Sequence, residues 1–324
     1  MRTRFLAVVL ALAVGLATMG LASPPEALAG NTYLRVLTIN LLFSEIKDRP
    51  ERLGIIADFV RSQSEPIDVI LLQEVVGGSL FGTKNSAQDL RNLLAARGLG
   101  YYLNTRVEEG IPGVASEGLA FLSRHKITLS IAETLPFVEM VNFQGIKFPL
   151  RRIVALNRIN IANYGPVNVY NTHLCNNCSP SGRAQQVGTV LNFIKTAEKL
   201  IPGDNPIILA GDFNIDLFFP NQRPAYNTII TNGFIDTYAA ANHVGLTCCN
   251  PSSGGPCCTL AVPGNPYAID FLSQLPEYPE RLDYIFAKGK GMTPAHIVSS
   301  EVVFNSPPNW VSDHSAVLTK IRLP

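Results

Sequence analysis

The sequence Pro206-Ile-Ile-Leu-Ala-Gly-Asp-Phe-Asn-Ile-Asp216 decides the fold of this chain. Its first half is an uninterrupted apolar run, which predicts a strand covered on both faces, as in the interior of an α/β protein. The run breaks at Gly211, and Asp212, Asn214 and Asp216 follow at alternate positions. A simple Asp/Asn turn is one interpretation. A functional site is the other, because several further predicted strands also end in polar residues.

Apolar periodicity predicts alternating strands and helices in the first half of the chain and clustered strands in the second half. The expected strands are residues 34–40, 67–74, 118–123, 127–131, 152–161, 167–174, 207–210, 281–286, 297–304 and 315–323. The expected helices are residues 51–63, 86–97, 181–200 and 224–231. This order predicts mixed sheets covered by helices. A long irregular segment, 239–280, separates the last helix from the closing strands, and segments of that length are usually functional or disordered.

The first 29 residues have the pattern of a signal peptide. Arg2 and Arg4 precede an apolar run from Phe5 to about Leu21, and Ala27-Leu-Ala29 is a small-x-small cleavage site. We therefore expect a secreted protein with one large domain over residues 30–324, and an uncleaved anchor is the alternative. Lys and Arg number 26 and Asp and Glu number 25, so the net charge neither favours nor excludes a polyanionic partner.

Six cysteines fit an exported protein with disulfide bonds. They occur as Cys175-x-x-Cys178 and as two vicinal pairs, 248–249 and 257–258. The last four flank a turn-rich stretch, and we expect them to cross-link that loop, although the sequence alone does not assign the pairing. A zinc site built from Cys175, Cys178 and one vicinal pair is the alternative.

Predicted strand ends and adjacent turns present a set of polar residues: Asn40, Glu74, Glu117, His173, Asp212, Asn214, Asp283, Asp313 and His314. Each one alone has a structural explanation, such as a helix cap or a hydrogen-bonded histidine. Apolar runs that end repeatedly in Asn, Glu, His and Asp are harder to explain separately, and they indicate one shared polar rim. Ligands and chemistry collect at the carboxyl ends of strands in such folds.

These residues belong to seven motifs: Thr38-Ile-Asn40, Leu72-Gln-Glu74, Glu117-Gly-Leu-Ala-Phe-Leu-Ser-Arg124, Asn171-Thr-His173, Gly211-Asp-Phe-Asn214, Arg281-Leu-Asp-Tyr284 and Ser312-Asp-His314. Their order and spacing resemble the endonuclease/exonuclease/phosphatase superfamily over about residues 34–323. The resemblance implies a four-layer α/β sandwich with two mixed β-sheets packed face to face and helices outside. The element around His173 resembles the branch of deoxyribonuclease I, sphingomyelinases and inositol polyphosphate phosphatases, in which a second catalytic histidine occurs here.

Chemistry and the resemblance agree on the metal and the base. Hydrolysis of a phosphodiester needs a nucleophilic water, neutralised nonbridging oxygens and help for the leaving oxygen. Asn40 and Glu74 offer hard oxygen ligands for Mg²⁺, with Mn²⁺ or Ca²⁺ as alternatives, and the resemblance places Asp313 near the same metal. His314 is the expected general base, and Asp283 is expected to hold its imidazole.

The other four residues of the set are expected to act on the substrate. Asp212 and Asn214 should orient the water and the phosphate. His173, paired with Glu117, should donate to the phosphate or to the leaving group. The resemblance thus implies a monomeric, metal-dependent phosphoric diester hydrolase. A noncatalytic binding protein on the same scaffold is an alternative, although such a protein would be expected to lack some of these residues.

The substrate is left open by the sequence. Secretion, length and the histidine-bearing motif resemble bacterial sphingomyelinase-type phospholipases C, which act on a phospholipid head group. Two apolar stretches, residues 217–220 and 271–278, could make transient contact with a membrane surface, or they could pack beneath the long loop. The sequence has no obvious paired-aromatic hairpin of the kind that those enzymes insert into membranes.

A secreted deoxyribonuclease I-like endonuclease is the second hypothesis. A nucleic-acid groove needs basic side chains that hold phosphates, and the candidates are Arg124, Lys126, Arg151, Arg152 and Arg183. An edge-strand charge pair is the ordinary explanation for Arg151 and Arg152. A phosphomonoesterase that acts on a soluble phosphate is a further hypothesis.

Overall fold

The computed structural model of the chain describes residues 32–42, 48–111, 113–143, 146–269 and 277–324. They belong to the unit that spans Asn31–Pro324. The predicted signal peptide lies outside the described residues, as does most of the apolar stretch 271–278. Among the helices of the described segments, none combines the length and the apolar character needed to cross a membrane.

Twelve strands of the described residues form the centre of the unit. They are β1 (Tyr33–Asn40), β2 (Val69–Gln73), β3 (Tyr102–Ile111), β4 (Ala115–Ser123), β5 (Lys126–Phe143), β6 (Ile146–Ile161), β7 (Gly165–His173), β8 (Ile207–Asp212), β9 (Ile235–Asp236), β10 (Asp283–Lys288), β11 (Ile297–Val303) and β12 (Ala316–Arg322). One sheet has the order β11-β12-β1-β2-β4-β3 and the other has the order β5-β6-β7-β8-β10-β9. Only β1–β2 and β7–β8 pair in parallel among these strands, so both sheets are mixed.

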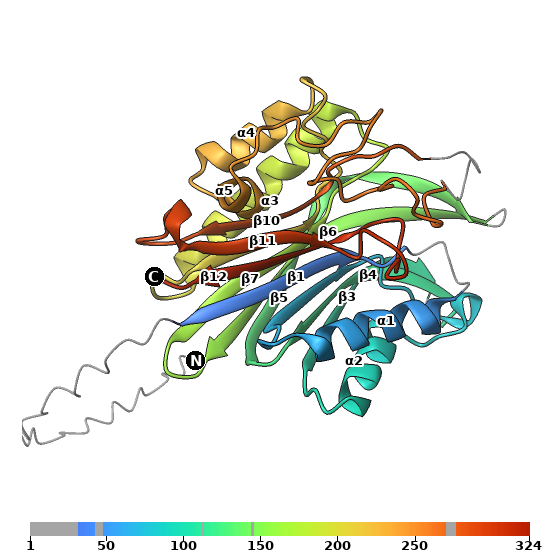
Figure 1. Ribbon diagram of the computed structural model, residues 1–324, viewed down its shortest axis with the longest axis horizontal. Helices are drawn as coiled ribbons and strands as arrows, with labels where there is room; N and C mark the ends of the chain where they lie inside the picture. Colours follow the sequence, from blue (N-terminus) through green and yellow to red (C-terminus); the bar gives the residue numbers. More distant parts are fainter. Residues whose placement is uncertain (1–31, 43–47, 112, 144–145, 270–276) are drawn as a thin grey trace, which may run out of the picture. The chain divides into compact units, whose positions relative to one another are not determined.

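Helices cover the outer faces of the two sheets (Figure 1). They are α1 (Arg49–Ser62), α2 (Ser86–Ala96), α3 (Pro180–Leu200) and α4 (Arg223–Thr231). The short α5 (Thr237–Asn242) instead contacts β10 and β11 and packs against the apolar cluster between the sheets, and η1 (Ser79–Phe81) and η2 (Pro294–His296) are 3-10 turns. α1 and α2 share an apolar cluster with the first sheet, and α3 and α4 share one with the second. The predicted four-layer α/β sandwich is confirmed.

The apolar run of β8 shows why this stretch decides the fold. Ile208 and Ala210 pack in the cluster between the two sheets, whereas Ile207 and Leu209 pack toward α3 and α4. All four side chains are buried, because adjacent residues of a strand point to opposite faces and both faces are covered. Full burial of one large aliphatic side chain contributes roughly 1.5–3 kcal/mol. Two-sided burial therefore explains why this strand has no polar alternation.

Strand β3 was not predicted from the sequence. Tyr102 and Val107 are 53% and 62% exposed, so this edge strand lacks the apolar alternation on which the prediction relied. Its pairing with β4 shifts register between Val107 and Glu109, so Glu108 is the extra residue of a β-bulge. Bulges redirect a side chain, and here the side chain of Glu108 is buried. The hairpin of β5 and β6 is also longer than expected, because residues 132–134, which continue the predicted strand 127–131, are exposed and give no apolar pattern.

Three disulfides use all six cysteines: 175–178, 248–257 and 249–258. The last two join the vicinal pairs across the turn-rich stretch, as predicted. The zinc alternative does not hold, because every cysteine sulfur is bonded to another sulfur. Segment 239–280 therefore contains a loop that is cross-linked twice.

Candidate active site

Three neighbouring strands of the second sheet align functional side chains in one row. The register of β7 and β8 places His173 opposite Asp212, and the register of β8 and β10 places Asp283 opposite the same Asp212. The preceding Gly211 has a positive φ of 137°, and a Cβ there would lie 1.9 Å from the carbonyl oxygen of Thr172. Only glycine fits this approach of β8 to β7. The row therefore depends on the Gly211-Asp212 pair that ends β8.

The first sheet contributes Asn40 and Glu74, which lie at the ends of β1 and β2 that face this row. Asn40 ends β1 opposite Gln73 of β2, and Glu74 follows directly with a positive φ of 54°. The Asn40 Nδ2 donates to Glu74 Oε1 at 3.0 Å and to Asp212 Oδ2 at 3.1 Å. One amide thus connects Glu74 beside the first sheet with the row of side chains in the second.

A buried polar network beneath the site joins the two sheets. Gln73 Nε2 donates to Asn171 Oδ1 at 2.8 Å and to Thr38 Oγ1 at 3.1 Å. Asn171 Nδ2 donates to the carbonyl oxygens of Leu72 and Ala120. Buried polar groups cost free energy unless they are hydrogen-bonded. These bonds therefore explain the buried Thr, Gln and Asn of the sequence motifs and hold the two sheets in a fixed position relative to each other.

The Oδ2 atom of Asp212 is the point on which the site converges. It accepts from Asn40 Nδ2 and lies 3.4 Å from His173 Nε2 and 3.8 Å from His314 Nε2. Burial raises the pKa of Asp212 to about 7, the charge of Asp283 adds to this, and His314 opposes it. Two imidazoles and an amide thus surround one carboxylate oxygen.

His314 and Asp283 form a hydrogen-bonded pair. Their Nδ1 and Oδ2 atoms are 2.8 Å apart, and both side chains are buried. Burial alone would lower the pKa of His314, but Asp283, with smaller effects of Asp313 and Asp212, raises it well above the ordinary value. A carboxylate in this position orients an imidazole and stabilises its protonated form. The arrangement is suited to a base that takes a proton at Nε2.

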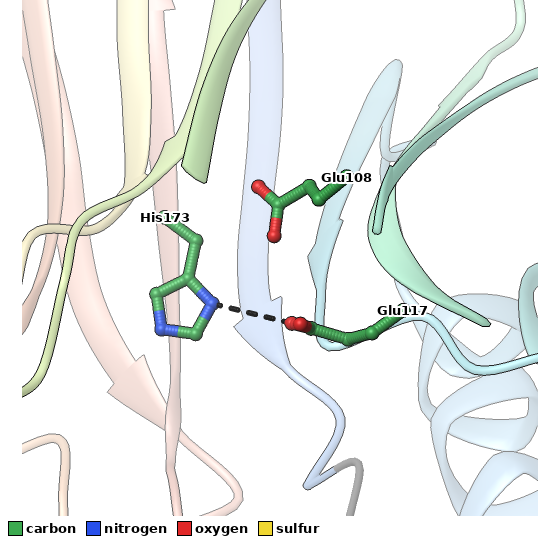
Figure 2. A group of neighbouring side chains, drawn as sticks. All are labelled: Glu108, Glu117 and His173. Carbon is green, nitrogen blue, oxygen red and sulfur yellow. Dashed lines mark ion pairs between the residues drawn. The ribbon is translucent and has the colours of Figure 1, made fainter. Parts of the chain in front are cut away.

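His173 has a different environment, in which an arginine lies between it and Glu117. The Nδ1 atom of His173 is 3.8 Å from Glu117 Oε1, the ion pair drawn in Figure 2. Arg152 Nη1 is closer, at 2.9 Å from Nδ1, and it also donates to Glu117 Oε1 at 3.0 Å. Burial, Arg152 and His314 all lower the pKa of His173, to well below the ordinary value. The direct pairing with Glu117 that the sequence suggested is thus mediated by Arg152.

Glu108 completes this cluster and was missed in the sequence. Its Oε2 lies 3.3 Å from Arg152 Nη1, and Figure 2 shows its carboxylate directed toward His173 and Glu117. Burial and the charge of Glu117 raise the pKa of Glu108, and Arg152 opposes them. The acidic pair Glu108-Glu109 was the only sequence signal. A β-bulge that turns one of the two inward is not visible in a residue pattern.

Asn214 and Asp313 hold turns beside the reacting groups. The backbone N of Asn214 donates to Asp212 Oδ1 at 2.9 Å, and its Nδ2 donates to the carbonyl oxygen of Leu174. Asp313 Oδ1 accepts from Ser312 Oγ at 2.9 Å and from the backbone N of His314 at 3.0 Å. Both residues therefore lie at the site, and their hydrogen bonds fix the backbone next to Asp212 and His314.

The cross-linked loop also supports the His314 side of the site. Thr259 directly follows the disulfide-bonded Cys258, and its Oγ1 accepts from the backbone N of Leu282 and of Asp283, both at 3.0 Å. The Thr259 carbonyl oxygen accepts from the backbone N of Ser315. The loop thus bonds to the start of β10 and to the turn after His314. No residue pattern in the loop indicates this role.

The oxygen atoms gathered at these strand ends fit a divalent metal ion. Glu74 Oε1 and Asp212 Oδ2 lie 3.0 and 3.1 Å from the same Asn40 Nδ2, so two carboxylates converge here, and hard oxygen atoms are the ligands that Mg²⁺ prefers. Two clusters of the described residues also have the spacing of metal ligands: Asp212–Asp283–His314 and Glu108–Glu117–His173. In the second cluster the guanidinium of Arg152 already supplies a fixed positive charge. The edge formed by Asn40, Glu74 and the Asp212 cluster is therefore the better place for a cation.

Solved structures of other proteins share this fold. An endonuclease/exonuclease/phosphatase family protein from Leptotrichia buccalis is 24% identical over 89% of this chain and 99% of its own, with a TM-score of 0.59. A mannosyl-6-phosphatase from Bacteroides thetaiotaomicron is 17% identical over 88% of this chain and 98% of its own, with a TM-score of 0.57. TDP2 from D. rerio, complexed with a single-strand DNA product, is 17% identical over 90% and 99%, with a TM-score of 0.59. These low identities show a shared fold alone.

The sequence itself identifies the family. A search of curated proteins finds no match to this chain. Residues 37–314, however, match the Endonuclease/Exonuclease/phosphatase family, and this range contains all nine polar residues at the predicted strand ends. The match covers most of the chain and confirms the resemblance seen in the motifs. The chain belongs to the endonuclease/exonuclease/phosphatase family and is a metal-dependent phosphoric ester hydrolase.

Proposed function

We propose that this protein is a secreted, Mg²⁺-dependent phosphodiester hydrolase that acts as a sphingomyelinase-like phospholipase C. The observation that carries the reaction is the convergence of His173 and His314 on Asp212 Oδ2, beside the Asn40–Glu74 pair. This geometry brings a base, a hydrogen-bond donor and metal ligands to one point. Hydrolysis of a phosphodiester needs all three.

The mechanism uses the two histidines in separate roles. A metal ion held by Asn40, Glu74 and Asp313 would supply neutralisation of the phosphate charge. His314 Nε2 removes a proton from water, and Asp283 stabilises the resulting imidazolium. The water oxygen forms a bond to phosphorus as the bond to the leaving oxygen breaks.

The other residues hold the reacting groups in place during this step. Asp212 orients the water, and the backbone bond from Asn214 fixes the Asp212 carboxylate. His173, on the other side of Asp212, donates a hydrogen bond to a phosphate oxygen. The proton that His314 has taken passes to the departing oxygen or to solvent, so His314 is ready for the next turnover.

The placement of the basic residues supports a substrate other than a polyanion. Arg152 and Arg183 are buried, and they donate to carboxylates and to backbone carbonyls respectively. Arg124 and Lys126 follow β4, at the end of that strand remote from the site, and Arg124 lies 3.7 Å from Asp68. These four residues therefore do not form a cationic track beside Asp212. A zwitterionic head group does not require one.

One apolar stretch beside the site supports contact with a lipid surface. Leu217 is buried in the core beneath α3 and α4. Phe218 and Phe219 are partly exposed, with ring centroids 5.5 Å apart, and Pro220 is exposed. The stretch is thus anchored at one end and reaches solvent at the other, a few residues after Asp216 of the deciding stretch. The three disulfides support the proposed secretion, because such bonds persist in oxidising compartments.

A nuclease is the second candidate, and one residue favours it. The side chain of Arg151 is 58% exposed on β6, where it pairs with Glu109 at 3.2 Å. It lies next to Arg152, whose guanidinium contacts His173. The DNA product bound in the related fold of TDP2 shows that such a scaffold can hold a nucleic acid. Exchange of Glu109 for a DNA phosphate would use Arg151 in this way.

The test assays the purified protein on each candidate substrate, in Mg²⁺ and in EDTA. Metal-dependent release of phosphocholine from sphingomyelin or phosphatidylcholine vesicles is expected. The double variant Phe218→Ala/Phe219→Ala should lose this activity while it keeps turnover of a soluble chromogenic phosphodiester. Nicking of plasmid DNA without phosphocholine release would overturn the proposal in favour of a nuclease, and loss of nicking in Arg151→Met would then locate the groove. Turnover of the soluble ester alone would indicate a small phosphorylated substrate, as in the mannosyl-6-phosphatase.

A further inference from the structure

The contact between Arg152 and His173 determines where the imidazole proton lies. We propose that Arg152 is a positioning residue that fixes His173 as a neutral imidazole with its proton on Nε2. A guanidinium has only N–H donors and no acceptor, and it stays protonated in proteins. Its Nη1 lies 2.9 Å from His173 Nδ1. The Nδ1 atom must therefore accept this bond through its lone pair, which leaves the ring proton on Nε2.

The other side of the ring agrees with this assignment. Nε2 of His173 faces Asp212 Oδ2 at 3.4 Å, and the same oxygen accepts from Asn40 Nδ2 at 3.1 Å. Because Asp212 Oδ2 acts as an acceptor toward Asn40, it is also a suitable partner for an N–H group on Nε2 of His173. The donor opposite Nδ1 thus requires this tautomer, and the carboxylate oxygen opposite Nε2 is compatible with it.

The guanidinium is held in place by two carboxylates. Arg152 is buried, and its Nη1 lies 3.0 Å from Glu117 Oε1 and 3.3 Å from Glu108 Oε2. Glu108 Oε1 in turn accepts from the backbone N of Ile153 at 3.3 Å. A buried charge without a partner is strongly destabilising. The β-bulge that turns Glu108 inward therefore supplies the second carboxylate that keeps Arg152 against His173.

The consequence is a histidine that does not gain a second proton near neutral pH. A proton on Nδ1 would place two N–H donors 2.9 Å apart, with a second positive charge beside the first. Burial also lowers the pKa of His173, which favours the neutral ring as well. For the proposed reaction, which this role presupposes, His173 then acts as a fixed hydrogen-bond donor from Nε2 to a phosphate oxygen. It does not act as an acid that releases a proton to the leaving group.

The tautomer can be measured on the substrate-free protein with its disulfides intact. Ring nitrogens of ¹⁵N-histidine-labelled protein are followed by NMR across roughly pH 5 to 8, the range in which an ordinary histidine titrates. The His173→Gln variant identifies the signals. We expect a proton on Nε2, a bare Nδ1 and no titration in this range. A proton on Nδ1, or a titration with an ordinary midpoint, would overturn the proposal whether or not the protein is a phospholipase.

Two variants test whether Arg152 is the cause. In Arg152→Met, Nδ1 loses its donor and faces Glu117, so we expect a proton on Nδ1 and a titration that enters the measured range. Arg152→Lys keeps a cationic donor and should restore the bare Nδ1. The matched control is Arg151→Met, which removes the adjacent exposed arginine and should leave the His173 signals unchanged. Wild-type signals in a folded Arg152→Met protein would overturn the assignment to Arg152. If that variant does not fold, the wild-type spectrum decides.

Discussion

The two histidines of the site share one partner and differ in the other. Both direct Nε2 toward Asp212 Oδ2, at 3.4 Å for His173 and 3.8 Å for His314. At Nδ1, His314 meets the carboxylate of Asp283 at 2.8 Å, whereas His173 meets the guanidinium of Arg152 at 2.9 Å. Burial lowers the pKa of both rings, and the carboxylate reverses this for His314 while the guanidinium adds to it for His173. The partner at Nδ1 therefore determines which ring can take a proton.

Removal of the proposed base should have the largest effect. In His314→Ala the water loses its proton acceptor, and general base catalysis contributes up to about 10⁴-fold in rate. We expect kcat on a soluble chromogenic phosphodiester to fall by about that factor. The matched control is His125→Ala, because His125 pairs with Asp68 at 3.2 Å at the remote end of the first sheet. A His314→Ala protein within tenfold of the wild type would remove His314 from the mechanism.

The carboxylate partner of His314 should come next. Asp283→Asn keeps the size of the side chain but removes the charge that orients and stabilises the imidazolium. We expect kcat to fall by about 10²-fold or more, with little change in KM. Asp58→Asn, which alters an exposed carboxylate paired with Arg97, should leave kcat unchanged. Equal kcat values in the two variants would show that Asp283 does not assist the base.

The sequence predicted the parts of the site that depend on local pattern. An apolar strand that is buried on both faces is recognisable in one stretch, and the polar residue at its end follows directly, as for Ile207–Asp212. Asn40 and His173 were found in the same way, at the ends of apolar runs, and Asp283 was found as a polar position near the start of a predicted strand. Their convergence could be expected because strands of one fold expose their ends at common edges. These inferences needed only residue order.

The sequence did not predict contacts that depend on pairing between distant strands. Glu108 was missed because its strand is mostly exposed and its inward direction comes from a bulge. Arg152 was considered only as a phosphate contact of a nuclease or as an edge-strand charge, since nothing near it in sequence shows that two carboxylates and an imidazole surround it. Thr259 lies in an irregular loop, and its bonds to β10 join residues more than 20 positions apart.

The third prediction concerns Thr259, whose loop supports the backbone beside His314, and its expected effect is smaller. Thr259→Val keeps the side-chain shape but removes the acceptor for the buried backbone N of Leu282 and Asp283. Each buried donor without a partner costs about 1–3 kcal/mol, so we expect the two donors together to lower the free energy of unfolding by about 2–6 kcal/mol. Denaturant unfolding measures this loss. Thr189→Val, whose hydroxyl bonds Gln185 on the exposed face of α3, is the control and should stay within about 0.5 kcal/mol of the wild type. Equal stabilities of the two variants would show that the loop does not support this side.

The smallest loss of kcat is expected for a change at Glu117, and this variant tests most directly whether His173 and His314 act differently. Glu117 Oε1 accepts from Arg152 Nη1 at 3.0 Å and lies 3.8 Å from His173 Nδ1. Glu117→Gln keeps an oxygen that can accept from Arg152, and Glu108 still balances the guanidinium charge, so His173 should keep its tautomer. We expect kcat to fall by less than about tenfold, equivalent to about 1.4 kcal/mol. If Glu117 instead accepted a proton-bearing Nδ1 directly, as Asp283 does for His314, its loss would resemble that of Asp283→Asn. The ratio of the two kcat values therefore measures whether the two histidines work alike.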